Sequence, residues 1–217
     1  MIKIENVEVF GWEAAIRGMR NPLNSWDKSD SYWTHIEDAE TQQTANFEYF
    51  VGDNDLKLMK SLAKAGDDHG KFLRMINVTL DIIAPLYWWK EFDTYKVGTV
   101  ANSCSTMHKI HAKEFTMDDF SCEYLDICNY FHLGETVKIL NRNREMFIET
   151  KDKQWWWWQL IQLLPSSYNQ KRTVQLNYQV LKSMYRARKN HKLDEWRTFC
   201  EWIKSLPYSE LITGEED

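Results

Sequence analysis

The stretch YWWKEFDTYKVGTVANSCSTMHKIH, residues 87–111, is the part of the chain from which the fold is best interpreted. Pro85 stands just before it, and proline fits the first turn of a helix because its missing N–H is not needed there. We therefore expect a helix over residues 86–95 that is closed by Gly98. Residues 99–106 are small and rich in hydroxyl groups. They are expected to form a polar loop whose side chains and backbone N–H groups can hold an anion or a nucleotide, although an ordinary solvated loop explains this composition equally well.

The composition predicts one domain with a large core. The chain has 217 residues with only 8 Gly and 4 Pro, and no linker rich in Pro, Gly or Ser divides it, so we take residues 1–217 as a single domain. Aromatic residues are abundant, with 11 Trp, 10 Tyr and 10 Phe. Some should fill the core, and others are expected to line a pocket or a subunit interface, where Trp and Tyr are favoured.

Charge and hydropathy exclude several classes of partner. The net charge is −5 and there is no basic tail, whereas binding to long nucleic acid requires many cations that neutralise phosphates. No apolar run approaches the length of a membrane span and no secretory signal is recognisable, so we expect no membrane partner and a cytoplasmic location. The cysteines form no Cys-x-x-Cys pair, which predicts free thiols in a reducing compartment. They are Cys104, Cys122, Cys128 and Cys200.

Apolar periodicity predicts a mostly helical chain with a small sheet. A strand is expected over residues 1–10, and another over 72–83, where Ile76, Val78, Leu80 and Ile82 alternate with polar residues. Helices are expected over residues 11–20, 53–65, 116–134, 135–164, 172–190 and 193–206. Gly66 should stop the helix over 53–65, the helical region 135–164 should be broken around its charged run 149–153, and the helix over 172–190 should be cationic. In the last helix, Trp196, Phe199, Cys200 and Ile203 should face inward. Residues 21–31 are expected to form a polar loop, with Arg17, Arg20 and Lys28 as solvated charges. The strands and helices do not alternate regularly, which favours an α+β fold, a single mostly helical domain with a small antiparallel or mixed sheet. Without Gly-x-Gly-x-x-Gly, Walker or Gly-x-Ser-x-Gly motifs, a Rossmann site and a hydrolase elbow have no support.

The run Trp155–Trp158 places an indole on every side of a helix. A helix that is apolar all round should be buried, either in the core or against another subunit. Together with the abundance of aromatic residues elsewhere, this run predicts a homo-oligomer. The alternative is that all four indoles lie in one deep core.

Cysteine and histidine residues allow two further chemistries. Cys104, His108 and His111 are spaced so that one face of a helix can present them together to zinc. Cys104 can also act as a nucleophile with His108 as its base. The run Ser103–Ser105 is a poor helix former, however, and the spacing matches no compact zinc motif. We therefore predict no metal site and no cysteine nucleophile.

The order of features resembles the flavin-dependent thymidylate synthases over about residues 50–110 and 172–206. In that family, a helix ending in Gly and an alternating strand precede a helix that leads into Arg-His-Arg and then Asn-Glu-Leu-Ser. Here Lys90-Glu91-Phe92 resembles the family's Arg-Gln-Leu, and Thr94-Tyr95-Lys96 falls where Arg-His-Arg is expected. Asn102-Ser103-Cys104-Ser105 stands for Asn-Glu-Leu-Ser, with one extra residue before it. A later helix opens at Asn177 and ends at Ala187-Arg188 in register with the family.

The resemblance implies reductive methylation of deoxyuridylate (dUMP), or of a related pyrimidine nucleotide, by a homotetramer. FAD would be the cofactor, with NADPH and methylenetetrahydrofolate as cosubstrates. The residues that the resemblance assigns to FAD are Tyr95, Lys96, Asn102 and Asn177. Those that it assigns to the nucleotide are Ser103, Cys104, Ser105 and Arg188, with Ser105 also taken as catalytic. Lys96 and Arg188 would meet one phosphate, and Tyr95 would stack on the flavin or hydrogen-bond to it.

Three departures from the family pattern support an alternative function. Thr94-Tyr95-Lys96 leaves one certain positive charge where the family has up to three. Ser103 replaces the family's Glu, and Met107 stands where an Arg is expected. The alternative is therefore a non-catalytic protein on the same scaffold that binds a nucleotide or a nucleotide signal.

Overall fold

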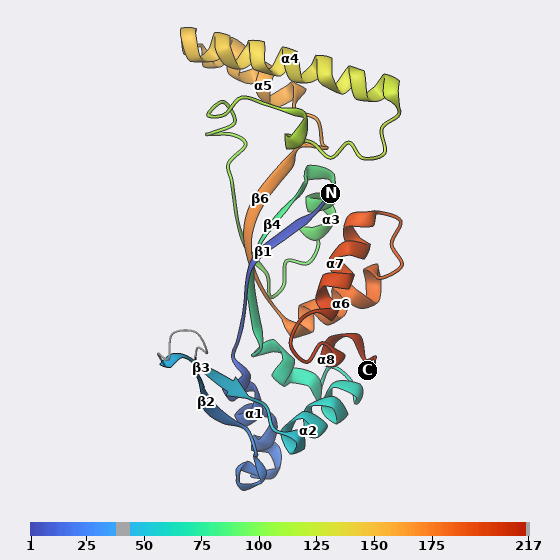
Figure 1. Ribbon diagram of the computed structural model, residues 1–217. Coiled ribbons are helices and arrows are strands. Elements are labelled where there is room, and N and C mark those ends of the chain that lie inside the picture. The colour runs from blue at the N-terminus through green and yellow to red at the C-terminus, as the bar shows by residue number, and fades with distance from the viewer. Residues whose placement is uncertain (38–43, 216–217) are drawn as a thin grey trace. The chain divides into compact units, whose positions relative to one another are not determined.

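The computed structural model describes residues 1–37 and 44–215 (Figure 1). Within them the chain forms two compact units. The first unit comprises residues 1–6, 80–96 and 100–174, and the second comprises residues 7–79, 97–99 and 175–217. Strands β1 (Lys3–Phe10), β4 (Asn77–Pro85) and β6 (Asn169–Asn177) each contribute residues to both units.

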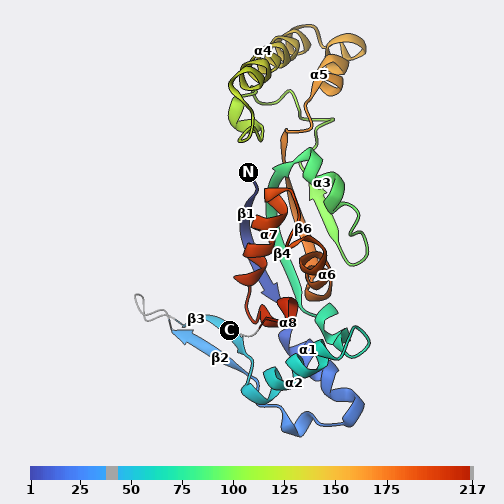
Figure 2. The same ribbon diagram turned by 90° about the vertical axis from the view of Figure 1, so that its right-hand side faces the viewer.

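The main sheet has four strands in the order β1-β4-β6-β5, where β5 is Val100–Ser103 (Figure 2). Leu86 N–H donates to Tyr168 O at one end of the β4–β6 pair, and Tyr178 N–H donates to Ile76 O at the other, so these strands run antiparallel. The alternation predicted for β4 is confirmed, because Ile76, Val78, Leu80 and Ile82 are fully buried. The α+β fold class with a small antiparallel sheet is confirmed as well.

The helix expected over residues 172–190 is wrong in its first part. Residues 169–177 form β6, a central strand of the sheet, and helix α6 occupies only Tyr178–Arg188. Val174 and Leu176 are buried while the alternate residues Thr173 and Gln175 are exposed, which is the period of two that a strand requires. Asn177 ends the strand and caps the helix, since its Oδ1 accepts a hydrogen bond from Val180 N–H at 3.1 Å.

The second unit holds most of the helices. They are α1 (Trp12–Arg20), α2 (Asp53–Lys64), α6, α7 (Asp194–Lys204) and α8 (Glu210–Thr213), with short 3-10 turns at Asn21–Leu23, Trp26–Lys28 and Gly70–Arg74. An antiparallel hairpin of β2 (Tyr32–Glu37) and β3 (Thr44–Phe50) follows residues 21–31, where a polar loop was expected. The predicted end of α2 is confirmed: the helix stops at Lys64, and Gly66 follows with a φ of 109°.

A buried ion pair fixes α1 to α2. Asp55 is fully buried, and its Oδ1 accepts a hydrogen bond from Arg20 Nε at 2.6 Å. Its Oδ2 accepts hydrogen bonds from the hydroxyl groups of Ser29 at 2.6 Å and Ser31 at 2.7 Å. Burial by itself raises the pKa of Asp55, but these hydrogen bonds and the positive charge of Arg20 together hold it below its ordinary value. Arg20, whose sequence context suggested a solvated charge, is therefore a structural residue.

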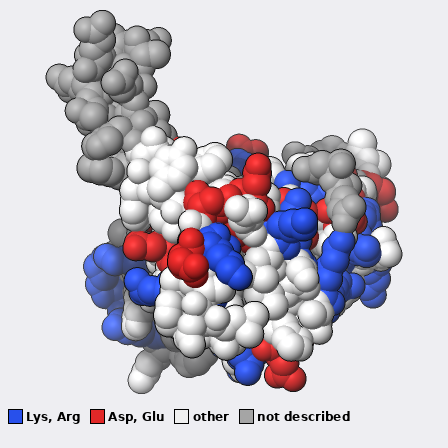
Figure 3. Space-filling model, turned by 90° about the horizontal axis from the view of Figure 1, so that it is seen from below, with Lys and Arg blue, Asp and Glu red and all other residues white. Residues whose placement is uncertain are grey.

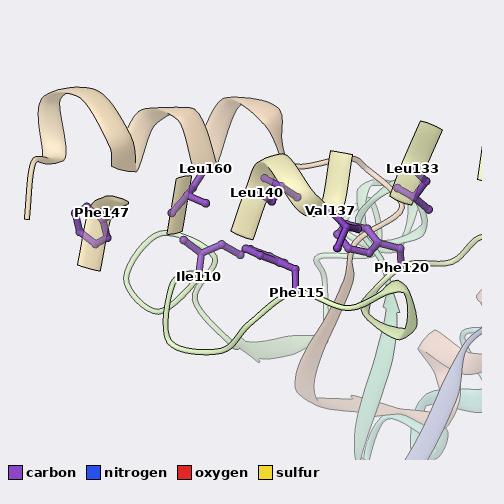
Figure 4. Packing of buried hydrophobic residues seen from close by; sticks show 8 residues of the cluster. All are labelled: Ile110, Phe115, Phe120, Leu133, Val137, Leu140, Phe147 and Leu160. Carbon is purple, nitrogen blue, oxygen red and sulfur yellow. The ribbon is translucent and has the colours of Figure 1, made fainter. Parts of the chain in front are cut away.

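The first unit contains a layer of two helices, α4 (Ile127–Thr150) and α5 (Trp158–Leu163), over a loop region (Figure 4). A buried cluster holds the helices to the loops, and its members come from both. They are Ile110, Phe115 and Phe120 of the loops, Leu133, Val137, Leu140 and Phe147 of α4, and Leu160 of α5. The predicted break near residues 149–153 is confirmed, because Lys151 adopts φ 57° after α4 and a π-helical turn follows at Lys153–Trp157.

The helix expected over residues 116–134 is wrong. Thr116 caps only a 3-10 turn, Met117–Asp119, and α4 begins at Ile127 with Asp126 as its N-cap. Gly134, the expected end, lies inside α4. Phe120 pairs with Tyr168 in an isolated β-bridge, so the backbone there is extended.

The four consecutive tryptophans are not enclosed in one core. Trp156 and Trp157 pack partly against the buried cluster, whereas Trp155 is 59% exposed and Trp158 is 45% exposed. Two indoles are therefore open on the surface of the single chain, which is unusual for such large apolar side chains.

Two surface properties bear on partners. Figure 3, seen from below the view of Figure 1, shows acidic and basic side chains interspersed, in keeping with the moderate net charge of −5. Within residues 1–37 and 44–215, none of the helices combines the length and the apolar character that crossing a bilayer requires.

Candidate functional site

The segment from Tyr95 to Ser105 carries most of the predicted site residues. It follows α3 (Leu86–Phe92), which starts directly after Pro85 as expected but ends three residues earlier than predicted. Asp93 N–H donates to Trp89 O at 2.8 Å and Tyr95 N–H donates to Phe92 O at 3.0 Å, which closes the helix in a tight turn. Tyr95 is half-buried there, and Lys96 is exposed.

Gly98 turns the chain toward β5 and adopts φ 79°, a conformation that other residues rarely take. A Cβ atom at this position would lie 3.1 Å from Asn177 Nδ2 and 3.2 Å from Val180 Cγ2. In the second unit, therefore, residues 97–99 lie directly against the start of α6. This contact brings the predicted residue Asn177 beside the turn that separates Lys96 from the donor-rich run.

A cluster in the first unit holds the end of α3 in place. Arg172 of β6 donates from Nη1 to Asp93 Oδ1 at 2.7 Å, and its guanidinium carbon lies 4.2 Å from the centre of the Trp89 ring. The indole of Trp89 donates to Gln170 O at 3.0 Å. Arg172 was expected on a cationic helix, but it is a strand residue whose charge is already paired.

The polar loop expected over residues 99–106 is in part a strand. Residues 100–103 form β5 at the edge of the sheet, beside β6, so their backbone is used in pairing. Cys104 continues this pairing, because its N–H donates to Lys171 O at 2.9 Å and its carbonyl accepts from Gln170 Nε2 at 2.7 Å. The loop expected over residues 99–106 is therefore a strand in residues 100–103, and the backbone groups that face β6 are used in pairing. β5 is an edge strand with one neighbour, so the expectation of exposed backbone N–H groups stays a prediction.

Three predicted side chains follow each other on this edge and are exposed: Asn102, Ser103 and Cys104. Ser105 has a more constrained role. Its Oγ accepts hydrogen bonds from Met107 N–H at 3.2 Å and from His108 N–H at 3.0 Å. Two accepted bonds leave the hydroxyl proton as the group that Ser105 can donate to a ligand.

Arg188, the last residue of α6, is half-buried rather than fully solvated. Its guanidinium carbon lies 4.9 Å from the centre of the Trp196 ring on α7. The neighbouring Lys189 is exposed and lies over the Tyr185 ring at 5.4 Å. The two adjacent cations of this helix end thus have different surroundings.

The predicted residues fall into two groups. Tyr95, Lys96 and Asn102–Ser105 belong to the first unit, whereas Asn177 and Arg188 belong to the second. That Lys96 and Arg188 face one phosphate stays a prediction.

Two polar side chains are added to the predicted residues: Thr99, which lies in the hydroxyl-rich run 99–106 but was not singled out there, and Gln179, which the sequence did not indicate. The hydroxyl of Thr99 and the carbonyl oxygen of Gln179 are buried and have no hydrogen-bond partner among the described residues. Buried polar groups are nearly always paired, so both atoms are candidates for contact with a ligand. Their residue types gave no signal, because burial is a property of the folded chain.

The zinc alternative does not have the geometry it requires. Residues 104–111 form turns rather than a helix, so Cys104, His108 and His111 do not share a helical face. The ring of His111 packs edge-on against Phe147 with a centroid distance of 4.8 Å. Burial, followed by the charges of Lys109, Lys151 and Arg144, lowers the pKa of His111. No group of three or more His, Cys, Asp or Glu residues in the described part of the chain is placed to hold a metal ion.

Comparison with solved structures places this geometry among known folds. The chain resembles flavin-dependent thymidylate synthase ThyX from Helicobacter pylori complexed with FAD and dUMP, with a TM-score of 0.68, 14% identity, and 98% of each chain covered. It also resembles the UMP/dUMP methylase PolB from Streptomyces cacaoi bound with 5-Br dUMP, with a TM-score of 0.62, 14% identity, and 99% of this chain and 95% of PolB covered. No protein family and no curated protein sequence matches the chain.

Proposed function

We propose that this chain, which has the fold of the flavin-dependent thymidylate synthases, binds FAD and methylates dUMP or a related pyrimidine nucleotide. The observation that carries the proposal is a likeness over nearly the whole chain to ThyX, which was solved with FAD and dUMP, and to PolB, which was solved with 5-Br dUMP. The resemblance noted in the motifs at residues 90–105 and 177–188 supports it independently. NADPH and methylenetetrahydrofolate would be the cosubstrates.

Polar groups at the start of α6 and in residues 97–99 beside it have the hydrogen-bonding capacity that a flavin ring requires. The unpaired Thr99 hydroxyl can donate a hydrogen bond, and the unpaired Gln179 carbonyl can accept one. A flavin ring presents carbonyl acceptors and an N–H donor, so it can satisfy groups of both kinds. Asn177 and Tyr95 would add further contacts, and Lys96 would neutralise a phosphate. When bound, FAD supplies the hydride chemistry of the reaction, which no side chain can provide.

The chain's own groups would bind and orient the nucleotide. The oxygen of Ser105 accepts hydrogen bonds from two backbone N–H groups, so its hydroxyl proton would be donated to an oxygen of the pyrimidine or of the phosphate. Asn102 and Ser103 offer further exposed polar groups on the same edge strand. Arg188 is half-buried against the Trp196 ring, and a guanidinium suits a phosphate or a pyrimidine carbonyl.

A second function is favoured by a specific observation. Lys96 provides one certain positive charge in the segment Thr94–Lys96, and Arg172 nearby is already paired with Asp93. A site with few free cations favours binding of a nucleotide over tight retention of a flavin diphosphate. The second candidate is therefore a nucleotide-binding protein without catalysis.

The purified protein tests both functions directly. A visible flavin spectrum, together with dTMP formed from dUMP in the presence of NADPH and methylenetetrahydrofolate, is expected for the enzyme. A colourless protein that binds dUMP in a calorimetric titration would instead support the second function. A protein that retains neither ligand would refute both.

Matched variants then test the residues. Each charge-assisted hydrogen bond to a phosphate contributes about 1.5–3 kcal/mol, so Lys96→Gln and Arg188→Gln should each weaken dUMP binding by roughly one to two decades. Lys189→Gln removes the exposed cation next to Arg188 at the end of α6 and should leave binding nearly unchanged. Equal effects of Arg188→Gln and Lys189→Gln would remove Arg188 from the site.

A further inference from the structure

A hollow of about 700 Å³ in the second unit is separate from every residue assigned to the proposed reaction. It is bordered by the end of β1, the first turn of α1, the hairpin β2–β3 and the turn that follows α7. Its volume lies in the range of sites that bind small molecules.

Aromatic rings form two of its walls. On the hairpin, the rings of Trp33 and Tyr49 meet edge to face with centroids 5.1 Å apart. Trp12 and Tyr208, which also line the hollow, meet in the same way with centroids 5.1 Å apart. Trp33 is 54% exposed, which leaves a face of its indole open to a ligand.

The lining of the hollow is negatively charged. Among the described residues that line it, the only charged ones are Glu13 and Glu48. The indole N–H of Trp33 donates to Glu13 Oε2 at 3.2 Å, which fixes this carboxylate against the aromatic wall and leaves its other oxygen available. The nearest basic residue on α1, Arg17, lines a neighbouring hollow instead.

The walls are held in shape before any ligand binds. Tyr208 adopts φ 52°, a strained conformation for a bulky residue that persists only when its surroundings impose it. The preceding residue is anchored by a hydrogen bond from the Tyr178 hydroxyl to Pro207 O at 2.6 Å. Burial, Glu13 and Asp55 raise the pKa of Tyr49, so its ring remains neutral at ordinary pH.

We propose that this hollow binds an organic cation, an ammonium or guanidinium group, which lies on the open aromatic faces with Glu13 and Glu48 as counter-ions. Aromatic faces attract cations through their quadrupole, and the carboxylates add the opposite charge. FAD and dUMP are anions, and two carboxylates repel a phosphate. This site therefore goes beyond the proposed function, and a test of cation binding here does not depend on whether the chain binds FAD or dUMP.

Calorimetric titration of the full chain with three probes tests the proposal. Choline represents small quaternary ammonium ligands, N-acetyl-arginine amide represents a guanidinium side chain of a protein, and 3,3-dimethylbutanol is the uncharged isostere of choline. We expect at least one cation to bind about tenfold or more tightly than dimethylbutanol. Tighter binding of choline identifies a small-molecule ligand, and tighter binding of the arginine amide identifies a side chain. Binding of dimethylbutanol as tight as that of both cations, or no binding of either cation, would overturn the proposal.

Variants locate the site. Trp33→Leu keeps an apolar side chain but removes the aromatic face, and it should weaken cation binding between about twofold and thirtyfold. Glu48→Gln should weaken binding of the cation and leave binding of dimethylbutanol unchanged. The matched control is Trp26→Leu, because Trp26 is 50% exposed in the same unit but lines the neighbouring hollow. If Trp26→Leu weakens cation binding as much as Trp33→Leu, or if Glu48→Gln changes nothing, the cation does not bind in this hollow. Circular dichroism confirms that each variant is folded.

Discussion

Substituting Asp55 by Ala should destabilise this protein more than loss of any surface charge. The carboxylate of Asp55 is fully buried and accepts five hydrogen bonds: from Arg20 Nε, from the hydroxyl groups of Ser29 and Ser31, and from the N–H groups of Asp30 and Ser31. Arg20 is itself only 5% exposed, so the substitution leaves a buried guanidinium without its counter-ion. Removing one partner of a buried pair costs about 3–5 kcal/mol.

Thermal and urea unfolding followed by circular dichroism measure this loss. For a chain of this length, 1 kcal/mol corresponds to about 2–4 °C, so Asp55→Ala should lower Tm by about 6–20 °C. The control is Asp53→Ala, which removes an exposed carboxylate from the first turn of the same helix and should cost no more than about 1 kcal/mol. The double substitution Arg20→Met with Asp55→Leu should be less destabilising than Asp55→Ala, because no charge remains buried.

Acid provides an independent check on the same residue. The pKa of Asp55 is lowered in the folded protein, so its contribution is complete above the ordinary value of 3.8 and is lost as pH falls through the lower folded value. The stability difference between wild type and Asp55→Ala should therefore narrow only in strong acid. A loss below about 1 kcal/mol at neutral pH, or a double variant as unstable as Asp55→Ala, would refute the reasoning.

Three further predictions concern separate elements. Hydrogen bonds from Thr173, Asn6 and Lys171 lower the pKa of Asp81 to about 2, so Thr173→Val should raise it toward 3.8 in an NMR titration, and an unchanged pKa would contradict this. Gly98→Ala should lower stability by about 1–2 kcal/mol in thermal melts because of its φ of 79°, whereas Gly134→Ala, in open space on α4, should leave stability equal or slightly higher. Replacing the two exposed indoles of the Trp155–Trp158 run by Ser should reduce the predicted homo-oligomer in light scattering, and a monomeric wild type would refute that assembly.

The elements that were predicted correctly are those in which apolar residues recur at a regular, uninterrupted spacing. In β4 and the residue just before it, four alternating apolar residues fix both the strand and its buried face. In α7 the residues Trp196, Phe199, Cys200 and Ile203 are all buried as their spacing predicted. The false helix at residues 116–134 arose because its apolar residues also have helical spacing. There the capping box of Thr116 with Asp119 closes only a 3-10 turn. The bridge from Phe120 to Tyr168 makes the backbone extended at Phe120, and this bridge cannot be recognised from the local sequence because Tyr168 is 48 residues away.

For the candidate site, the sequence identified residue types but not their environments. Lys96 and Arg188 are equally cationic in the sequence, yet one is exposed and the other lies half-buried against Trp196. The pairing of Arg172 with Asp93 joins residues on α3 and β6 that are far apart in the chain, so no local pattern indicates that this charge is neutralised. The same holds for the pair of Arg20 with Asp55. Long-range contacts decide which charges remain available for a ligand.

The strand order β1-β4-β6-β5 has a consequence for the synthesis of this protein. When β4 has left the ribosome at residue 85, its first neighbour β1 is already present, but β6 begins only at residue 169, a span of 84 residues later. At a translation rate of about 5–20 residues per second, the second edge of β4 stays unpaired for about 4–17 s. An open, apolar strand edge pairs readily with other chains. During this time the nascent protein is exposed to aggregation through β4, the strand that is most buried once folding is complete.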